Sequence, residues 1–175
     1  MKIDLRELEL KEISEIELDN YLSLISDVKN NMEHPEWLGD FSKEDYINLI
    51  KNNAHIYACI YNDELIAAGV LIPSSEKDLN KFLSQDLNHM EVVDFGPEVV
   101  HPNYVGNGLQ DRIIKFLEKK SIEFGYKYGL VTIHPDNIYS IKNLINNGFL
   151  EIGYVELKRG PRKIYRKNLK DLNNL

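Results

Sequence analysis

The stretch "VHPNYVGNGLQDRII", residues 100–114, is the part of the sequence that decides the fold. A strand-like apolar run ends at its start, and a helical pattern of apolar and polar residues begins at its end. Gly106 and Gly108 lie between the two. Glycine gives a loop access to positive φ angles and lets a ligand approach the backbone, and the N–H groups at a helix N-terminus attract anions. The spacing favours a phosphate-binding loop, although an ordinary strand-to-helix turn has the same pattern.

Two other nucleotide-binding loops do not match this stretch. A P-loop requires Gly-Lys followed by Ser or Thr, and no such residues follow Gly108. A dinucleotide-binding fingerprint requires a third glycine and a ribose-binding acid at a set distance, and both are missing. A dinucleotide-dependent oxidoreductase is therefore the weaker interpretation, and a failure to bind NADH would exclude it.

Length and composition indicate one soluble domain over residues 1–175. The chain is 43% apolar and 28% charged, with a mean hydropathy of −0.37. No apolar run approaches the roughly 20 residues that cross a bilayer, and the first residues are charged rather than signal-like. The single cysteine, Cys59, excludes an internal disulfide and reads as a small core residue of a strand. We expect a cytoplasmic monomer or homodimer with no membrane partner.

Charge is divided unevenly along the chain. Residues 1–100 contain 21 acidic and 8 basic residues, whereas residues 101–175 contain 7 acidic and 13 basic residues. One interpretation is a protein with two ligands of opposite charge, and the other is two solvated faces that differ by chance. The isoelectric point near 5.3 argues against nucleic acid as the main partner.

Hydrophobic periodicity and turn residues predict a mixed α/β domain with a central strand–helix–strand unit. The Asn62-Asp63 pair predicts a hairpin turn, and Gly96-Pro97 predicts a bulge or a kink, because proline cannot donate a ladder hydrogen bond. The expected strands are 1–8, 54–61, 64–73, 89–102, 127–135, 149–158 and 163–169. The expected helices are 16–32, 42–50, 108–125 and 136–149, with 74–88 as a connecting insertion that carries a weak helical stripe.

Residues Val100 to Leu109 resemble the cofactor motif of the GCN5-related N-acetyltransferases (GNAT), Val-x-Pro-x-Tyr-Arg-Gly-x-Gly-Ile/Leu-Gly. A second block also resembles that family, whose pattern is Asn-x-x-Ala-x-x-x-Tyr-x-x-x-Gly-Phe. Its counterparts here are Asn137, Ser140, Leu144 and Gly148-Phe149. The order of elements fits over residues 1 to about 169. The resemblance implies the GNAT-like acyl-CoA N-acyltransferase fold, a mixed α+β fold with a central mixed sheet of about seven strands flanked by about four helices.

The resemblance further implies that acetyl-CoA is the co-substrate. Pantetheine would pair with the strand at a bulge, and backbone N–H groups would bind the phosphates. Two positions depart from the family pattern, since Val105 replaces an Arg or Gln and Gln110 replaces a Gly or Ala. The implied cofactor-binding residues are Glu98, Val99, Val100, Val105, Gly106, Asn107, Gly108, Leu109, Gln110, Asn137 and Ser140.

The implied chemistry is acetyl transfer to an amine, which must first lose a proton. Asp94 and Glu98 are both candidates for the general base, directly or through water. The family's usual thiol-side Tyr is Leu144, and Leu cannot donate a proton, so Tyr139 or Ser140 would have to replace it. Leu144 also favours the alternative of a degenerate module that binds acyl-CoA without turnover. The histidines show no metal-binding spacing, so no metal is expected.

The loop "EHPEWLGDF", residues 33–41, lies where this family covers its acceptor. Glu33, Glu36, Trp37 and Asp40 would present negative charge and an aromatic ring to a cationic amine. A polyamine, an aminoglycoside-like amine or a basic peptide terminus would fit such a site. The positive second half of the chain would suit the phosphates of CoA. The identity of the acceptor stays open.

Overall fold

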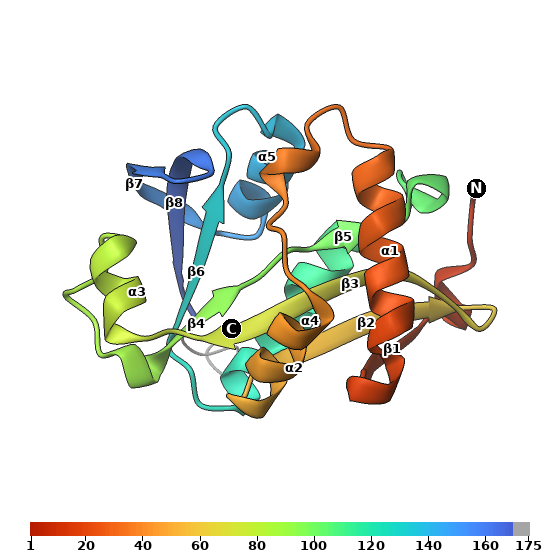
Figure 1. Ribbon diagram of the computed structural model, residues 1–175, viewed down its shortest axis with the longest axis horizontal. Helices are drawn as coiled ribbons and strands as arrows, with labels where there is room; N and C mark the ends of the chain where they lie inside the picture. Colours follow the sequence, from red (N-terminus) through yellow and green to blue (C-terminus); the bar gives the residue numbers. More distant parts are fainter. Residues whose placement is uncertain (170–175) are drawn as a thin grey trace. The chain divides into compact units, whose positions relative to one another are not determined.

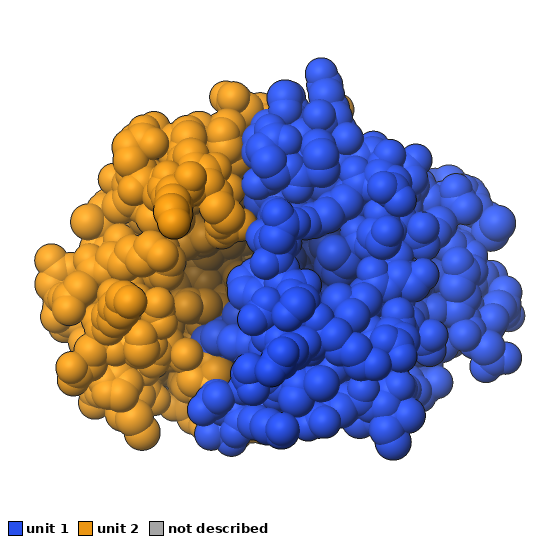
Figure 2. Space-filling model, viewed as in Figure 1, with its two compact units in different colours: residues 1–72, 96–117 blue, residues 73–95, 118–175 orange. Residues whose placement is uncertain are grey.

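A computed structural model describes residues 1–169 of the chain. These residues form two compact units, shown in separate colours in Figure 2. Unit 1 consists of residues 1–72 and 96–117, and unit 2 consists of residues 73–95 together with the chain from residue 118 onward. Each unit has its own strands, helices and core.

Unit 1 contains four strands, two complete helices and the first part of a third (Figure 1). Strand β2 pairs antiparallel with β1 and with β3, and β3 pairs antiparallel with the short strand β5. The elements are β1 (Glu9–Glu12), α1 (Leu18–Asn30), α2 (Lys43–Lys51), β2 (His55–Tyr61), β3 (Glu64–Pro73), β5 (Val99–Val100) and α4 (Leu109–Glu123).

Helices cover both faces of the unit 1 strands. Tyr21 and Leu24 of α1 pack with Ile56 and Val70 on one face. On the other face α4 lies so close that a Cβ atom on Gly69 would stand 2.6 Å from the side chain of Ile113. Only glycine permits this approach at residue 69. The packing fixes the helix that follows the Gly106–Gly108 loop.

Unit 2 is built from a mixed set of strands (Figure 1). Strand β4 is parallel to β6, whereas β8 is antiparallel to both β6 and β7. Leu79 of α3 packs with Val92, Leu130 and Ile164 in a core cluster. The elements are α3 (Glu76–Lys81), β4 (Val92–Phe95), β6 (Tyr128–Ile133), α5 (Ile138–Asn146), β7 (Leu150–Leu157) and β8 (Gly160–Asn168).

The structure confirms the predicted mixed α+β class and most of the predicted elements. Asn62 and Asp63 have φ angles of 49° and 62°, as a two-residue hairpin turn requires. Residues 1–169 contain eight strands and five α-helices, against about seven and about four predicted. The numbers differ because the irregular segment 96–98 divides the predicted strand 89–102 into β4 and β5, and because the insertion carries helix α3.

The predicted opening strand over residues 1–8 is wrong. Leu5–Glu7 form a short 3₁₀ helix, and the first strand is β1, which starts at Glu9. Asp4 caps this turn, since its carboxylate accepts hydrogen bonds from the backbone N–H and the guanidinium of Arg6. Such local bonds to an Asp side chain compete with strand pairing.

Candidate functional site

The loop before α4 leaves the backbone uncovered at Gly106 and Gly108, the two glycines of the predicted phosphate-binding loop. Gly106 and Gly108 have φ angles of 86° and 71°, in the left-handed region that favours glycine. A Cβ atom built at either position would meet no heavy atom within 4 Å beyond the adjoining residues. The carbonyl of Gly108 accepts a hydrogen bond from the N–H of Arg112, so the α4 hydrogen-bond ladder begins here. The loop thus offers an uncovered backbone at the N-terminus of a 15-residue helix.

The side chain of Asn107 holds this loop in place. Its Nδ2 donates to the carbonyls of Met1, at 2.7 Å, and Tyr104, at 2.8 Å. Its Oδ1 accepts a hydrogen bond from the N–H of Ile3 at 3.3 Å. Any ligand contact from Asn107 would therefore come from its backbone. Val105, by contrast, points into solvent and is an exposed apolar residue at the loop.

Glu98 lies in the irregular segment between β4 and β5, as the Gly96-Pro97 pair predicts. The N–H of Gly96 bonds to the carbonyl of Val70 at 2.7 Å, and Val99 and Val100 pair with β3. Within residues 1–169, Oε1 of Glu98 is buried and has no hydrogen-bond partner. Burial raises the pKa of Glu98 to about 8. Glu98 therefore combines a desolvated carboxyl group with an oxygen that is not committed to another residue.

Asp94 lies on β4 in unit 2 and has a partner. The hydroxyl of buried Ser74 donates to its Oδ1 at 2.6 Å. Burial raises the pKa of Asp94 to about 7, although the Ser74 bond acts in the opposite direction. The even spacing of Asp94 and Glu98 would place both side chains on one face of a regular strand. The ladder is interrupted at residues 96–98, so that alternation does not hold.

The second family block forms the start of α5 and part of the core. Asn137 caps the helix, with its Oδ1 accepting a 3.3 Å hydrogen bond from the N–H of Ser140. Leu144 is only 1% exposed and is a core residue. Tyr139 is 87% exposed on the surface of α5. Asn137 and Ser140 have a local structural role in this block, and a catalytic role for Tyr139 stays a prediction.

The predicted acceptor loop is at the surface of unit 1, and its acids have neighbours. Glu36 accepts a hydrogen bond from His34 at 3.1 Å if His34 carries the proton. The ring of Trp37 stacks on His34, with centroids 4.7 Å apart and planes 18° apart. Asp40 forms an ion pair with Lys29. Glu33 is exposed.

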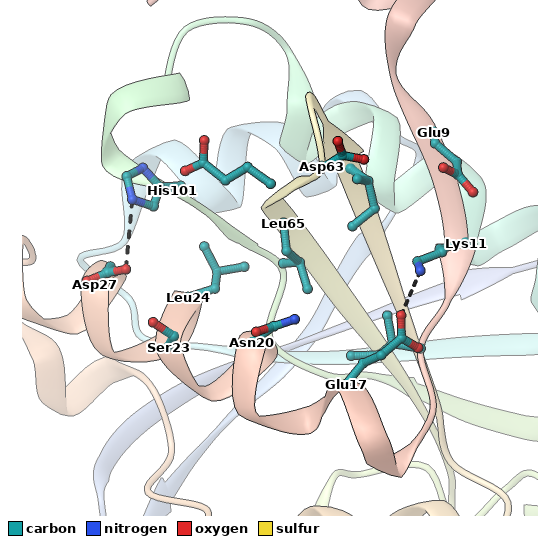
Figure 3. Close-up of a pocket in the computed structure, with 13 residues that line it drawn as sticks. Glu9, Lys11, Glu17, Asn20, Ser23, Leu24, Asp27, Asp63, Leu65 and His101 are labelled. Atoms are coloured by element: carbon teal, nitrogen blue, oxygen red, sulfur yellow. Dashed lines mark hydrogen bonds and ion pairs between the residues drawn. The ribbon is translucent and has the colours of Figure 1, made fainter.

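A second acidic feature of unit 1, which the sequence analysis missed, is a cavity of about 400 Å³ (Figure 3). Its walls come from α1, β1, the β2–β3 hairpin and the residue after β5. Nζ of Lys11 pairs with Glu17 at 2.6 Å, and Nε2 of His101 lies 3.9 Å from Asp27. Five carboxylates line the cavity, those of Glu9, Glu17, Asp27, Asp63 and Glu64, around the apolar residues Ile13, Leu24, Ile60 and Leu65.

The structure gives no support for a metal site or for a reactive cysteine within residues 1–169. Residues 1–169 contain no group of three or more His, Cys, Asp or Glu side chains that could hold a metal ion. Cys59 is buried in β2, and burial raises the pKa of its thiol to about 12, which disfavours a reactive thiolate. No helix in the same range is long and apolar enough to cross a bilayer.

Comparisons of the sequence with family profiles and with curated proteins found no match. Comparison of the structure with solved structures found acetyltransferases. An acetyltransferase of the GNAT family from Streptococcus pneumoniae matches with a TM-score of 0.72, at 14% identity over 93% of this chain and 99% of its own. The ribosomal-protein-S18-alanine N-acetyltransferase from Escherichia coli matches with 0.71, at 11% identity over 96% and 98%.

A third match is yncA from Salmonella typhimurium, solved with its cofactor acetyl-CoA. It has a TM-score of 0.73, at 12% identity over 94% of this chain and 95% of its own. At these identities the likeness concerns the fold. The chain has the GNAT acetyltransferase fold that its sequence resemblance predicts.

Proposed function

We propose that residues 1–175 act as one N-acetyltransferase domain, which moves an acetyl group from acetyl-CoA to a primary amine of a small molecule or peptide. The observation that carries this proposal is the open Gly106–Gly108 loop at the start of α4, in a chain with the GNAT fold. The fold alone does not specify a function, so the loop chemistry is the stronger argument.

The residues of the loop fit a CoA phosphate. The backbone from Val105 to Gln110 would bind it through N–H groups, aided by the positive end of the α4 dipole. The backbone of Glu98, Val99 and Val100 would pair with the pantetheine amides, as a peptide pairs with a strand edge. When bound, acetyl-CoA supplies the acetyl group as a thioester, so that a C–N bond forms, the C–S bond breaks and CoA leaves as its thiol.

Glu98 is the general base in this proposal, because its buried Oε1 is free to accept the proton that the attacking amine must lose. Asp94 is the alternative base, and Ser74 already occupies one of its oxygens. Burial raises the pKa of Asp94 to about 7 and that of Glu98 to about 8, close to neutral pH, which suits proton transfer. Tyr139 is proposed to protonate the leaving thiolate, because Leu144 cannot.

The acceptor is proposed to be a cationic amine, held by acidic residues of unit 1. Two groups of acids in unit 1 support this part of the proposal. One is the surface loop with Glu33, Glu36 and Trp37, and the other is the cavity with its five carboxylates. Both would attract a positively charged molecule at low salt.

The test is to mix the protein with acetyl-CoA and a panel of amines and to measure the release of free CoA thiol. We expect release that depends on the amine and is faster with polyamines than with amines of a single charge. Binding of acetyl-CoA without release, for every amine tested, would favour the non-catalytic acyl-CoA-binding module instead.

A further inference from the structure

Asn107 lies between the two glycines of the predicted phosphate-binding loop and connects that loop to residues 1–3, which lie beside it in unit 1 (Figure 1). Ile3 is 104 residues away in the sequence, yet its N–H donates to Oδ1 of Asn107 at 3.3 Å. Nδ2 of Asn107 donates to the carbonyl of Met1 at 2.7 Å and to that of Tyr104 at 2.8 Å. The side-chain amide therefore pairs with the backbone of residues 1–3 as a peptide group would.

Asn107 does not cap the helix that follows it. Asn88 and Asn137 stand at the starts of a 3₁₀ helix and of α5, and each accepts a hydrogen bond from a backbone N–H two or three residues ahead. Asn107 accepts its bond from Ile3 instead, and Gly108, which directly precedes α4, has no side chain that could cap. The acceptor of Asn107 therefore leaves the first N–H groups of α4 to a ligand, and these are the groups that bind a phosphate.

The loop needs such a restraint because both of its glycines are uncovered. Gly106 and Gly108 have positive φ angles, and a Cβ atom at either would meet no heavy atom within 4 Å beyond the adjoining residues. Glycine has more conformational freedom than any other residue, so a loop with two glycines loses more entropy when a ligand orders it. The three hydrogen bonds of Asn107 restrain the loop at the residue between the glycines, before any ligand binds.

We propose that Asn107 is a positioning residue for the cofactor, and that its bonds to residues 1–3 hold the glycine loop in the conformation that binds the CoA phosphates. The inference rests on the proposed function, because it assumes that those phosphates bind the backbone of this loop. It adds that part of the affinity for CoA comes from a side chain that does not touch the cofactor and from a segment about a hundred residues away in the sequence.

Two substitutions break the connection from opposite sides. Asn107→Leu removes the side-chain amide, and Ile3→Pro removes the N–H that donates to it. In calorimetric titration we expect each variant to bind CoA about tenfold more weakly, and the double variant to resemble Asn107→Leu alone, because both changes remove one shared interaction. Leu5→Pro is the matched control, since Leu5 is the first residue of a short 3₁₀ helix, where proline is tolerated. Wild-type affinity in Asn107→Leu or in Ile3→Pro would overturn the proposal.

Pantetheine, the part of CoA without phosphates, separates an effect on the phosphate loop from a general loss of structure. The ratio of the affinity for CoA to that for pantetheine should fall about tenfold in Asn107→Leu and in Ile3→Pro, and should keep its wild-type value in Leu5→Pro. Equal losses for the two ligands would mean that Asn107 only supports the fold, and would overturn the proposal. Wild-type protein that binds no CoA would contradict the proposed function itself, whereas CoA binding that both variants retain would contradict only the positioning role.

Discussion

The hydroxyl of Tyr104 donates a 2.6 Å hydrogen bond to the carboxylate of Glu64. Tyr104 lies two residues before Gly106, and Glu64 lines the acidic cavity. This bond joins the start of the glycine loop to the cavity rim within unit 1. His101 makes a second connection, because it lines the cavity and begins the segment that leads to the loop. The phosphate-binding candidate and an acceptor-binding candidate are therefore connected within unit 1.

The acceptor acids should act through charge. In the double variant Glu33→Gln, Glu36→Gln, we expect KM for a polyamine to rise about three- to tenfold, with little change for an aromatic amine that is uncharged at neutral pH. Exposed charges are screened over about 8 Å at physiological salt, so the wild-type KM for the polyamine should also rise with salt. Steady-state kinetics at two salt concentrations measure both effects.

The cavity provides the comparison for that experiment. The double variant Glu9→Gln, Asp63→Asn removes the same number of charges from the cavity rim. Whichever double variant has the higher KM for the polyamine identifies the acids that bind the acceptor. If neither pair changes KM, or if uncharged amines are the best acceptors, the cationic acceptor is wrong.

Gly108→Val should weaken CoA binding at least tenfold, because a branched side chain would occupy the open face of the loop and resist a φ of 71°. Calorimetric titration with CoA measures the effect. Gly125→Val is the matched control, since Gly125 also has a positive φ, of 86°, and open space around it, at the other end of α4. Equal CoA affinity in the two folded variants would remove the loop from the binding site.

Glu98→Gln should lower the acetylation rate at neutral pH by about 10² to 10⁴, as expected for loss of a general base. The wild-type rate should rise with pH until Glu98, with a pKa of about 8, is ionised. The variant should lack this rise and should recover only in part at higher pH, where more of the amine is deprotonated. Asp94→Asn tests the alternative base, whose pKa burial raises to about 7. A loss of only a few-fold in both variants would mean that neither carboxylate is the base.

The same carboxyl group should make stability depend on pH. The pKa of Glu98 is about 8 in the folded protein against an ordinary value of 4.5, so above pH 4.5 the folded state keeps a proton that the unfolded chain loses. The free energy of unfolding therefore falls as pH rises towards 8. Glu98→Gln removes this contribution. The melting temperature of the variant minus that of wild type should therefore increase between pH 5 and pH 9. Parallel curves would show that Glu98 is not buried as described.

Local chemistry explains which features the sequence could predict. The hairpin at Asn62-Asp63, the break at Gly96-Pro97 and the open turn at Gly106 each depend on the conformational limits of one or two residues. The strand expected over residues 1–8 failed for a local reason as well, because Asp4 forms a capped turn that the apolar alternation does not reveal.

The remaining features depend on residues that are distant in the sequence. The carboxylates of the cavity come from separate segments, among them β1, α1 and the β2–β3 hairpin. No single sequence motif therefore predicts the cavity. Arg162 stands in "KRGPRK", which reads as a solvated turn until its burial is known. Glu98 was a candidate from its position, but only the structure shows that its Oε1 lacks a partner.

The most direct test of the account is to follow the acetyl group itself. The protein is incubated with acetyl-CoA labelled in the acetyl carbons and with a mixture of polyamines and amino acids, and the products are identified by mass spectrometry. We expect a labelled N-acetyl amine, formed in equal amount to free CoA and strongly reduced in Gly108→Val and in Glu98→Gln. Labelled acetyl-CoA that is bound by the protein yet recovered unchanged with every acceptor would contradict it.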